Sequence, residues 1–254
     1  MNILAVGDVF GVPGVDILTR RLGRLRAESE ADIVVVNGEN ACIRGISPAF
    51  ADAMFQAGAD VITLGNHALD NRQICDYFDD NKYIIRPANM PGQYPGPGYA
   101  LLDCMGKRVC VMNLIGRKDM DFGFESPFSV ADSIMKEAGA DIYVVDFHAE
   151  ATSEKAAMAY FLDGRASVLF GTHTHVPTAD ERVFPGGLGF ITDVGMTGAM
   201  DSVIGVKPRQ SLSAFLGELP SRFEAADGDV RIQSALFTLN AQGACLSVRR
   251  IELY

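Results

Sequence analysis

A pair of histidines that follows an apolar run is the segment of this sequence most suited to chemistry. The run Val168-Leu169-Phe170 leads into Gly171-Thr172-His173-Thr174-His175. Two histidines at spacing i, i+2 at the end of a strand project toward the same side, so both imidazoles can reach one small volume. This spacing is typical of a metal site. The ordinary alternative is a strand end with two solvent-facing or hydrogen-bonded rings, and the rest of the chain has to decide.

Four other apolar runs also end in side chains that bind metals or transfer protons. We predict strands at residues 3–6, 33–36, 61–64, 142–145 and 168–170. The residues that follow these strands are, in order, Asp8, Glu39 with Asn40, Asn66 with His67, His148, and His173 with His175. In open α/β sheets, ligands bind beyond the carboxyl ends of the strands. Five such coincidences, which include every histidine of the chain, predict one shared site.

Helices must carry the chain back between these strands. Recurring apolar residues predict helices at residues 15–27, 47–57, 69–78, 130–138 and 153–162, and Ser47 with Pro48 is a plausible helix start. Such alternation of strands and helices implies a parallel sheet with right-handed crossovers. Residues 99–104 and 108–114 are expected to pair as antiparallel strands, and residues 81–98 to form a long surface loop.

The last third of the chain lacks this alternation. After His175 we expect short strands at residues 181–184 and 188–192, a Gly-rich loop, a short helix near residues 211–216 and two β-rich runs at residues 230–239 and 245–253. This part is expected to complete a second sheet packed on the first. The loop at residues 116–128 is a candidate lid, because it carries Arg117, Lys118, Phe122, Phe124 and Phe128.

Composition and charge limit the functional classes. The 254 residues are 48% hydrophobic and 21% charged, which allows a substantial core, and the formal net charge is −10. That charge argues against a surface that holds duplex nucleic acid. The first residues do not read as a signal peptide, no run approaches transmembrane length, and the five cysteines form no Cys-x-x-Cys pair. We therefore expect a cytoplasmic protein without a membrane partner. Its oligomeric state, a homo-oligomer included, stays open.

The donors of the shared site are imidazoles, carboxylates and amide oxygens, without a thiolate. This mixture suits borderline ions such as iron, manganese, zinc or cobalt. The donors other than His67 are too many for one tetrahedral ion and suit two ions that share a carboxylate: Asp8, Glu39, Asn40, Asn66, His148, His173 and His175. The positive charge of two divalent ions exceeds the combined negative charge of Asp8, Glu39 and a bridging hydroxide by about one unit. An acidic protein can thus still attract a phosphate.

These motifs resemble those of the calcineurin-like metallophosphoesterases. Gly7-Asp8, Gly65-Asn66-His67, His148 and Gly171-Thr172-His173-Thr174-His175 match that superfamily in order, over most of the chain. Two departures, Phe10 at the histidine of an Asp-x-His motif and Glu39 at the bridging aspartate, are similar to its YmdB-type branch. So are Asn37-Gly38-Glu39-Asn40, Asp146-Phe147-His148-Ala149-Glu150 and Asp193-Val194-Gly195-Met196-Thr197-Gly198. The resemblance implies an α/β fold, a sandwich of two mixed β-sheets flanked by helices, with residues 1–254 as a single metallophosphoesterase domain.

The resemblance also implies an activity and a ligand set. Members of the branch are 2′,3′-cyclic-nucleotide 2′-phosphodiesterases with a dinuclear centre, for which iron is favoured over manganese or zinc. One ion would be held by Asp8, Glu39, Asn40 and His175, and the other by Glu39, Asn66, His148 and His173. Asn40 is the residue placed to replace the ligand missing at Phe10. A turn residue or a phosphate donor are the alternatives for Asn40.

The expected reaction is metal-dependent hydrolysis of a small phosphodiester or cyclic nucleotide. A hydroxide that bridges the ions attacks phosphorus in line, and the ions neutralise charge on the non-bridging oxygens. His67 then protonates the leaving alkoxide as general acid; a helix-start histidine without chemistry is its alternative. Candidates for supporting roles, each with an ordinary turn or solvated role as the alternative, are Glu150 and Asp193 beside the metal-bound histidines and Arg44, Arg117 and Lys118 at phosphate or base.

Three other functions remain open from the sequence. The same site could serve a broader phosphodiesterase or a phosphomonoesterase, and a panel of substrates would separate these. A regulatory protein could retain the metal site for binding a partner. An amidohydrolase fits least, because Gly65-Asn66-His67 has no obvious use there.

Overall fold

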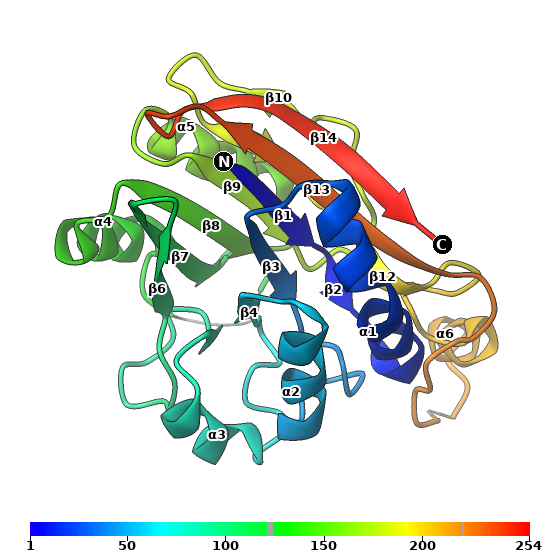
Figure 1. Ribbon diagram of the computed structural model, residues 1–254. Coiled ribbons are helices and arrows are strands. Elements are labelled where there is room, and N and C mark those ends of the chain that lie inside the picture. Colours follow the sequence, from blue (N-terminus) through cyan, green and yellow to red (C-terminus); the bar gives the residue numbers. More distant parts are fainter. Residues whose placement is uncertain (121–123, 220) are drawn as a thin grey trace.

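The structure, a computed structural model, describes residues 1–120, 124–219 and 221–254. One β-sheet contains β1 (Asn2–Val6), β2 (Asp8–Val9), β3 (Ile33–Asn37), β4 (Val61–Thr63), β5 (Ile84–Ile85), β12 (Met196–Ala199), β13 (Val230–Leu239) and β14 (Cys245–Leu253). The other contains β6 (Tyr99–Cys104), β7 (Lys107–Ile115), β8 (Ile142–His148), β9 (Val168–Thr172), β10 (Arg182–Val183) and β11 (Gly189–Ile191). Figure 1 shows both sheets and the helices around them.

Both sheets are mixed. The first has the order β2-β12-β13-β1-β3-β4-β5, with β14 also paired to β13, and the second has the order β10-β11-β9-β8-β7-β6. β1, β3, β4 and β5 are parallel, and so are β7, β8, β9 and β11. β13 runs antiparallel to β1, and β6 runs antiparallel to β7, as predicted for residues 99–114. The predicted α/β fold with two mixed sheets is confirmed.

Helices cover the outer face of each sheet. α1 (Gly11–Glu28), α2 (Pro48–Ala57) and α3 (Ile74–Asp80) pack on the first sheet, and α4 (Pro127–Ala138) and α5 (Thr152–Leu162) pack on the second. Within β1, Leu4 and Val6 face the helices whereas Ile3 and Ala5 face the other sheet. Burial on both faces explains why the central strands read as continuous apolar runs. α6 (Pro208–Phe215) lies between β12 and β13 in the chain.

The C-terminal third was expected to complete a second sheet, and it does so only in part: β10 and β11 join the second sheet, whereas its other strands join the first. β12, β13 and β14 join the same sheet as β1, because β13 pairs with β1 from Asn2 with Thr238 to Val6 with Ser234. The second sheet is built mainly from the middle of the chain, with β10 and β11 added at one edge.

Two local expectations are also wrong. The helix predicted at residues 69–78 begins only at Ile74, because the side chain of Asn71 accepts a hydrogen bond from the Gln73 amide at 3.2 Å and holds the preceding segment in turns. Residues 81–98 are not simply a surface loop, since they contain β5 and the buried side chains of Arg86 and Asn89. Within the described ranges, no helix combines the length and apolar character needed to cross a bilayer.

Candidate metal centre

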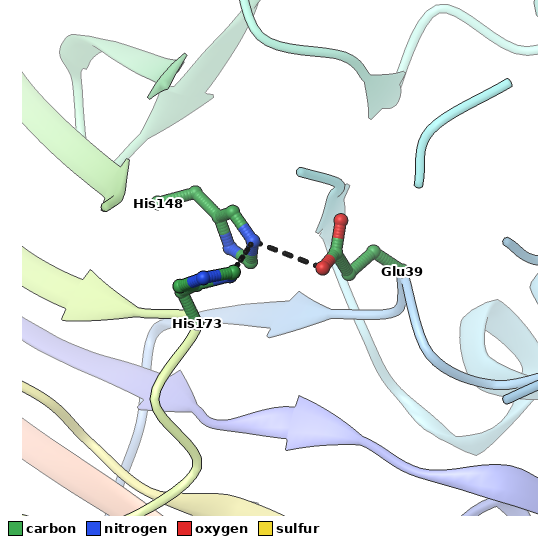
Figure 2. Close-up of side chains that lie close together, drawn as sticks. All are labelled: Glu39, His148 and His173. Atoms are coloured by element: carbon green, nitrogen blue, oxygen red, sulfur yellow. Dashed lines mark hydrogen bonds and ion pairs between the residues drawn. The ribbon is translucent and has the colours of Figure 1, made fainter. Parts of the chain in front are cut away.

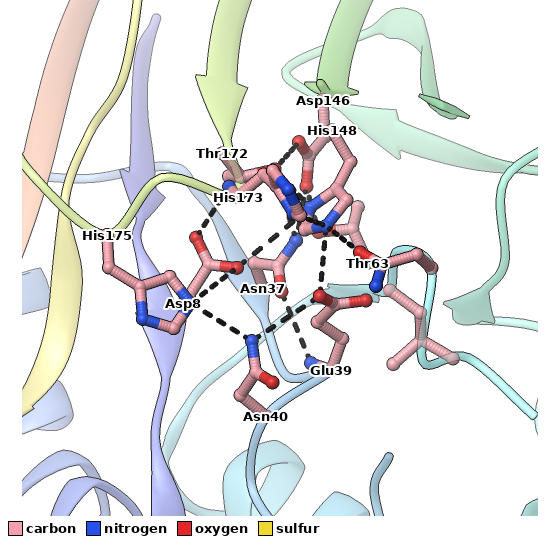
Figure 3. A network of polar contacts seen from close by, with 12 residues as sticks. Asp8, Asn37, Glu39, Asn40, Thr63, Asp146, His148, Thr172, His173 and His175 are labelled. Atoms are coloured by element: carbon pink, nitrogen blue, oxygen red, sulfur yellow. Dashed lines mark hydrogen bonds and ion pairs between the residues drawn. The ribbon is translucent and has the colours of Figure 1, made fainter. Parts of the chain in front are cut away.

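The carboxyl ends of five parallel strands meet at one edge of the sandwich. Asp8 follows β1, Glu39 follows β3, Asn66 follows β4, His148 ends β8, and His173 follows β9. Figure 3 shows Asp8, Glu39, His148 and His173, with neighbouring polar side chains, pointing into one volume between the two sheets. The predicted site therefore draws on both sheets of the fold.

One group of donors surrounds the Nε2 atom of His148. This atom lies 2.9 Å from Oε1 of Glu39, 2.8 Å from Oδ1 of Asn66 and 3.0 Å from Nδ1 of His173. The ligand atoms of Glu39, His148 and His173 all lie within 4.8 Å of one another, as Figure 2 illustrates. Carboxylate, imidazole and amide oxygen atoms that converge in this way can hold a metal ion.

A second group lies beside the first and shares Glu39. Nε2 of His175 lies 3.1 Å from Nδ2 of Asn40 and 3.8 Å from Oδ1 of Asp8. Nδ2 of Asn40 also donates to Oε1 of Glu39 at 3.4 Å, so the Glu39 carboxylate stands between the two groups. Asn40 presents its amide nitrogen here; its oxygen would face the site after rotation of the amide. The structure thus brings the seven predicted ligands together.

Two observations show that a cation fits this site. Oδ1 of Asp8 is buried and has no hydrogen-bond partner among the described residues, which is costly for a carboxylate unless a cation compensates it. Gly65 leaves the space that the donors face: a Cβ at this position would lie 2.2 Å from Oε2 of Glu39 and 2.4 Å from Nε2 of His148. The residues therefore have both the chemistry and the room for a metal.

The two histidines of the Gly171 motif converge through a strained turn and not through strand alternation. β9 ends at Thr172, and His173 and His175 adopt φ values of 100° and 64°. Such positive φ angles are uncommon for residues other than glycine and persist only where the surroundings impose them. Nδ1 of His175 donates to the carbonyl of Ile204 at 2.9 Å, which leaves Nε2 facing Asp8.

A buried ion pair contacts the turn that carries His173 and His175. Nζ of Lys155 lies 2.9 Å from Oδ2 of Asp193 and donates to the carbonyl of Thr172 at 2.9 Å. The Asp193 carboxylate also accepts from the hydroxyl of Thr174 at 2.8 Å and from the Gly195 amide at 2.9 Å. Asp193 therefore acts on the backbone between the two histidines, whereas the sequence had suggested contact with a histidine. Lys155 was not foreseen.

A second polar chain, also not foreseen, orients His148. Its Nδ1 lies 2.8 Å from the hydroxyl of Thr172, which donates to Oδ1 of Asp146 at 2.7 Å. Asp146 also accepts from Nδ2 of Asn37 at 3.0 Å and from the hydroxyl of Thr63. Because Nδ1 is engaged, Nε2 of His148 is left for an ion. Asp146 stands two positions before His148 on the same strand, and this spacing could have indicated it.

Burial and the neighbouring charges set the protonation states of the metal-free site. Burial alone disfavours the charge on Glu39, but the adjacent His148 lowers its pKa to about 2. Burial likewise opposes the charge on His148, but Glu39 raises its pKa to about 9. Burial and the charge on His148 lower the pKa of His173 to about 3, and burial raises the pKa of Asp8. His148 therefore carries a proton at neutral pH while His173 is neutral.

His67 lies at the rim of the centre. Its backbone amide donates to Oε2 of Glu39 at 3.1 Å, and its Nε2 lies 3.1 Å from Nδ2 of Asn66. Its Nδ1 lies 2.9 Å from Oδ2 of Asp70, which also pairs with Nε of Arg44 at 3.0 Å. The imidazole thus stands next to the ligands without joining them, and a carboxylate supports it from outside.

The remaining candidates divide into two groups. Oε2 of Glu150 lies 3.3 Å from Nε2 of His173, at the site. The backbone amides of Arg117 and Lys118 instead donate to Glu154, and Nζ of Lys118 pairs with Asp119. Of the candidate lid's aromatic residues, Phe122 lies outside the described residues, Phe128 packs on Phe161 and Phe124 borders a cavity beside Asn66.

Comparison with known proteins identifies the family of this chain. A family model described as "YmdB-like protein" matches residues 4–251. The chain belongs to the YmdB-like family. A Bacillus subtilis (strain 168) protein named 2′,3′-cyclic-nucleotide 2′-phosphodiesterase is 40% identical over 245 residues, which are 95% of this chain and 92% of that protein. The predicted family is therefore confirmed.

Solved structures agree with this membership of the YmdB-like family. A crystal structure of a hypothetical protein from Thermus thermophilus superposes with a TM-score of 0.94 at 37% identity, covering 100% of this chain and 99% of that one. A crystal structure of a protein described as a novel phosphatase, from Mycoplasma pneumoniae, has a TM-score of 0.93 at 31% identity, covering 100% and 93%. The sandwich is the metallophosphoesterase-type fold that the motifs predicted.

Proposed function

We propose that this protein is a metal-dependent phosphodiesterase that hydrolyses 2′,3′-cyclic nucleotides at the 2′ ester bond. The observation that carries the proposal is the convergence of Glu39, His148 and His173 beside His67, in a chain of the YmdB-like family. The name of the B. subtilis relative, which aligns over 95% of this chain, supports this choice of substrate. Because strand ends from both sheets form the site, the proposed activity requires both sheets of the fold.

We assign two metal ions to the site. Asp8, Glu39, Asn40 and His175 would hold one ion, and Glu39, Asn66, His148 and His173 the other, with iron favoured over manganese or zinc. The position of the Glu39 carboxylate between the two groups supports this division. When bound, the ions supply Lewis acidity toward the phosphate oxygens and activate water as the nucleophile.

His67 is the proposed general acid. Nε2 faces the Asn66 side of the centre, where the leaving 2′ oxygen would receive its proton, and Nδ1 is held by Asp70. The Asp70 carboxylate fixes the orientation of the ring. Asn40 has two proposed roles, as a ligand through its oxygen or as a donor to a phosphate oxygen through Nδ2, the atom that now faces Glu39 and His175.

We also propose that residues 1–254 act as one metallophosphoesterase domain. β1 at the start of the chain pairs with β13 near its end, and the amide of Leu239 donates to the carbonyl of Met1 at 2.8 Å. Removal of either segment would therefore disturb the sheet that carries Asp8.

The test combines metal analysis with turnover. Protein purified without added metal should contain about two metal ions per chain and convert 2′,3′-cyclic AMP to 3′-AMP. A His67→Ala variant should lose about 10²–10⁴-fold in kcat and keep its metal. His148→Ala, the matched control, should lose metal as well.

Three results would count against the proposal. Metal loss in His67→Ala would make His67 a ligand and not the acid. Preference of the wild-type protein for phosphate monoesters would favour a phosphatase, the class given for the M. pneumoniae protein. Full turnover by the His148→Ala variant would remove the metal centre from the reaction.

A further inference from the structure

A cavity beside His67 is used neither by the metal centre nor by the acid. Its volume is about 310 Å³, and the residues that matter for its chemistry are Asn66, Asp70, Arg72, Met90, Tyr94 and Phe124. This volume is at the lower end of the range for small-molecule sites. Because Asn66 lines the cavity and is also a proposed metal ligand, the cavity borders the centre.

We propose that this cavity binds the nucleobase of the substrate, with Tyr94 as the principal stacking residue. The inference rests on the proposed function, since it concerns the part of the cyclic nucleotide that does not react. It assigns the base to side chains other than the proposed acid.

The chemistry of the substrate places the nucleoside on this side of the centre. Both ester oxygens of a 2′,3′-cyclic phosphate belong to the same ribose, so the oxygen that His67 protonates stays attached to the nucleoside. The ribose must then lie within hydrogen-bond reach of His67. The base is attached at the carbon next to C2′, and the lining of the cavity includes Asn66 and Asp70, two of the side chains that contact the His67 ring.

The walls of the cavity suit a flat aromatic ligand. Tyr94 is 39% exposed and Met90 is buried, and together with Phe124 they supply an apolar lining. The guanidinium of Arg72 makes no hydrogen bond or ion pair with the described residues, so its donors are available to the polar edge of a base. Stacking on an aromatic ring tolerates any base, because every base has a π-face.

Buried polar side chains fix the Tyr94 wall. The guanidinium of Arg86, only 6% exposed, donates to the carbonyls of Tyr94 at 3.1 Å, Pro95 at 3.2 Å and Pro87 at 2.8 Å. Asn89, fully buried, donates to the carbonyl of Glu125 at 3.0 Å and so ties this wall to the segment that carries Phe124. A preformed wall lowers the entropic cost of binding a base.

A larger cavity of about 590 Å³ is the competing location. It is lined by Gly11, Ala41, Ile43, Phe50 and Phe223, among others, and borders the loop after Asn40. It shares no residue with the His67, Asn66 and Asp70 cluster. A base placed there would lie on the side of Asp8 and Asn40, away from the oxygen that His67 protonates.

The test compares 2′,3′-cyclic AMP with glycerol 1,2-cyclic phosphate, a five-membered cyclic diester without a base. In Tyr94→Ala, the ratio of kcat/KM for 2′,3′-cyclic AMP to that for the base-free diester should fall about 10- to 100-fold, mostly through KM. Tyr94→Phe should keep the wild-type ratio, because the ring remains. Phe223→Ala, which alters the larger cavity, is the matched control and should keep the ratio as well.

Binding of 3′-AMP to the metal-loaded protein, measured by calorimetry, gives a readout that does not need turnover. If Tyr94→Ala binds 3′-AMP about tenfold or more weakly than the wild type, the base site stands even when the wild-type protein proves not to be a cyclic phosphodiesterase. An unchanged ratio and unchanged 3′-AMP binding in Tyr94→Ala would overturn the inference. A fall of the kcat/KM ratio in Phe223→Ala would also overturn it, because that result would place the base in the larger cavity.

Discussion

The buried pair of Lys155 and Asp193 offers the sharpest test of how the histidine turn is held. Both side chains are almost completely buried, at 1% and 0% exposure. Removing one partner of such a pair leaves a charge without compensation and costs about 3–5 kcal/mol of folding free energy. We therefore expect both Lys155→Met and Asp193→Asn to destabilise the metal-free protein by amounts in this range.

The contacts predict which variant suffers more. In Lys155→Met, the Asp193 carboxylate keeps donors from Thr174 and Gly195. In Asp193→Asn, the Lys155 ammonium keeps one full acceptor, the carbonyl of Thr172 at 2.9 Å. Asp193→Asn should therefore lie near the upper end of the range and Lys155→Met near the lower end. For a chain of this size, about 2–4 °C of thermal midpoint per kcal/mol gives a fall of roughly 6–20 °C.

Urea unfolding of the metal-free variants at neutral pH measures these costs, and the double variant measures the coupling. Because the two residues contact each other, the double variant should cost about 1–3 kcal/mol less than the sum of the single costs. Arg24→Ala is the matched control: its ion pair with Glu28 is 60% and 52% exposed, and its loss should cost under about 1 kcal/mol. A cost below about 1 kcal/mol for Asp193→Asn, or purely additive effects, would refute the reasoning.

Four further outcomes are expected from the metal centre itself. Gly65→Ala should abolish metal binding in elemental analysis, because its Cβ would meet Glu39 and His148. The control Gly23→Ala should keep the metal, because its Cβ would meet only a carbonyl at 3.8 Å. Equal metal contents in the two variants would contradict this prediction. Metal binding near pH 7 should release a proton, since His148, with a pKa of about 9, must become neutral. Calorimetry in buffers of different ionisation enthalpy should show this release. The affinity for the metal should increase with pH up to about pH 9. For the same reason the charged His148 with Glu39 stabilises the metal-free fold below pH 6.5, and this stabilisation should disappear as the pH rises through about 9. Chelation should lower the thermal midpoint, because a bound ion stabilises only the folded state, and an unchanged midpoint would argue against a bound ion.

The convergence of the candidate ligands could be predicted from the sequence, because local patterns place side chains at strand ends. Apolar runs marked β1, β3, β4, β8 and β9, and the residues that converge lie within a few positions after each run. Parallel strands bring their carboxyl ends to one edge whatever the details of their register. The residues that could contact an ion were therefore accessible without knowledge of the packing.

The supporting contacts could not be predicted, because they depend on pairings between distant segments. The pairing of β13 with β1 joins residues more than 220 positions apart, and no local pattern signals it. Lys155 has the sequence context of a surface residue on an amphipathic helix. In the structure it is buried against Asp193, which lies on a distant loop. The positive φ angles of His173 and His175 are likewise not signalled by their own sequence; Asp193 accepts from the Thr174 amide between them, and the carbonyl of Ile204 accepts from Nδ1 of His175.

The position of β13 has a consequence for synthesis on the ribosome. β1, which leads to Asp8, is flanked by β3 on one side and by β13 on the other, so one of its edges stays unpaired until residues 230–239 have emerged. Every proposed ligand is translated by residue 175, but the first sheet cannot close before nearly the whole chain is made. Long-range pairing of this kind folds slowly and leaves a strand edge exposed to other nascent chains. A chain that stops before β13 would thus contain all the ligands and still be unable to assemble the centre.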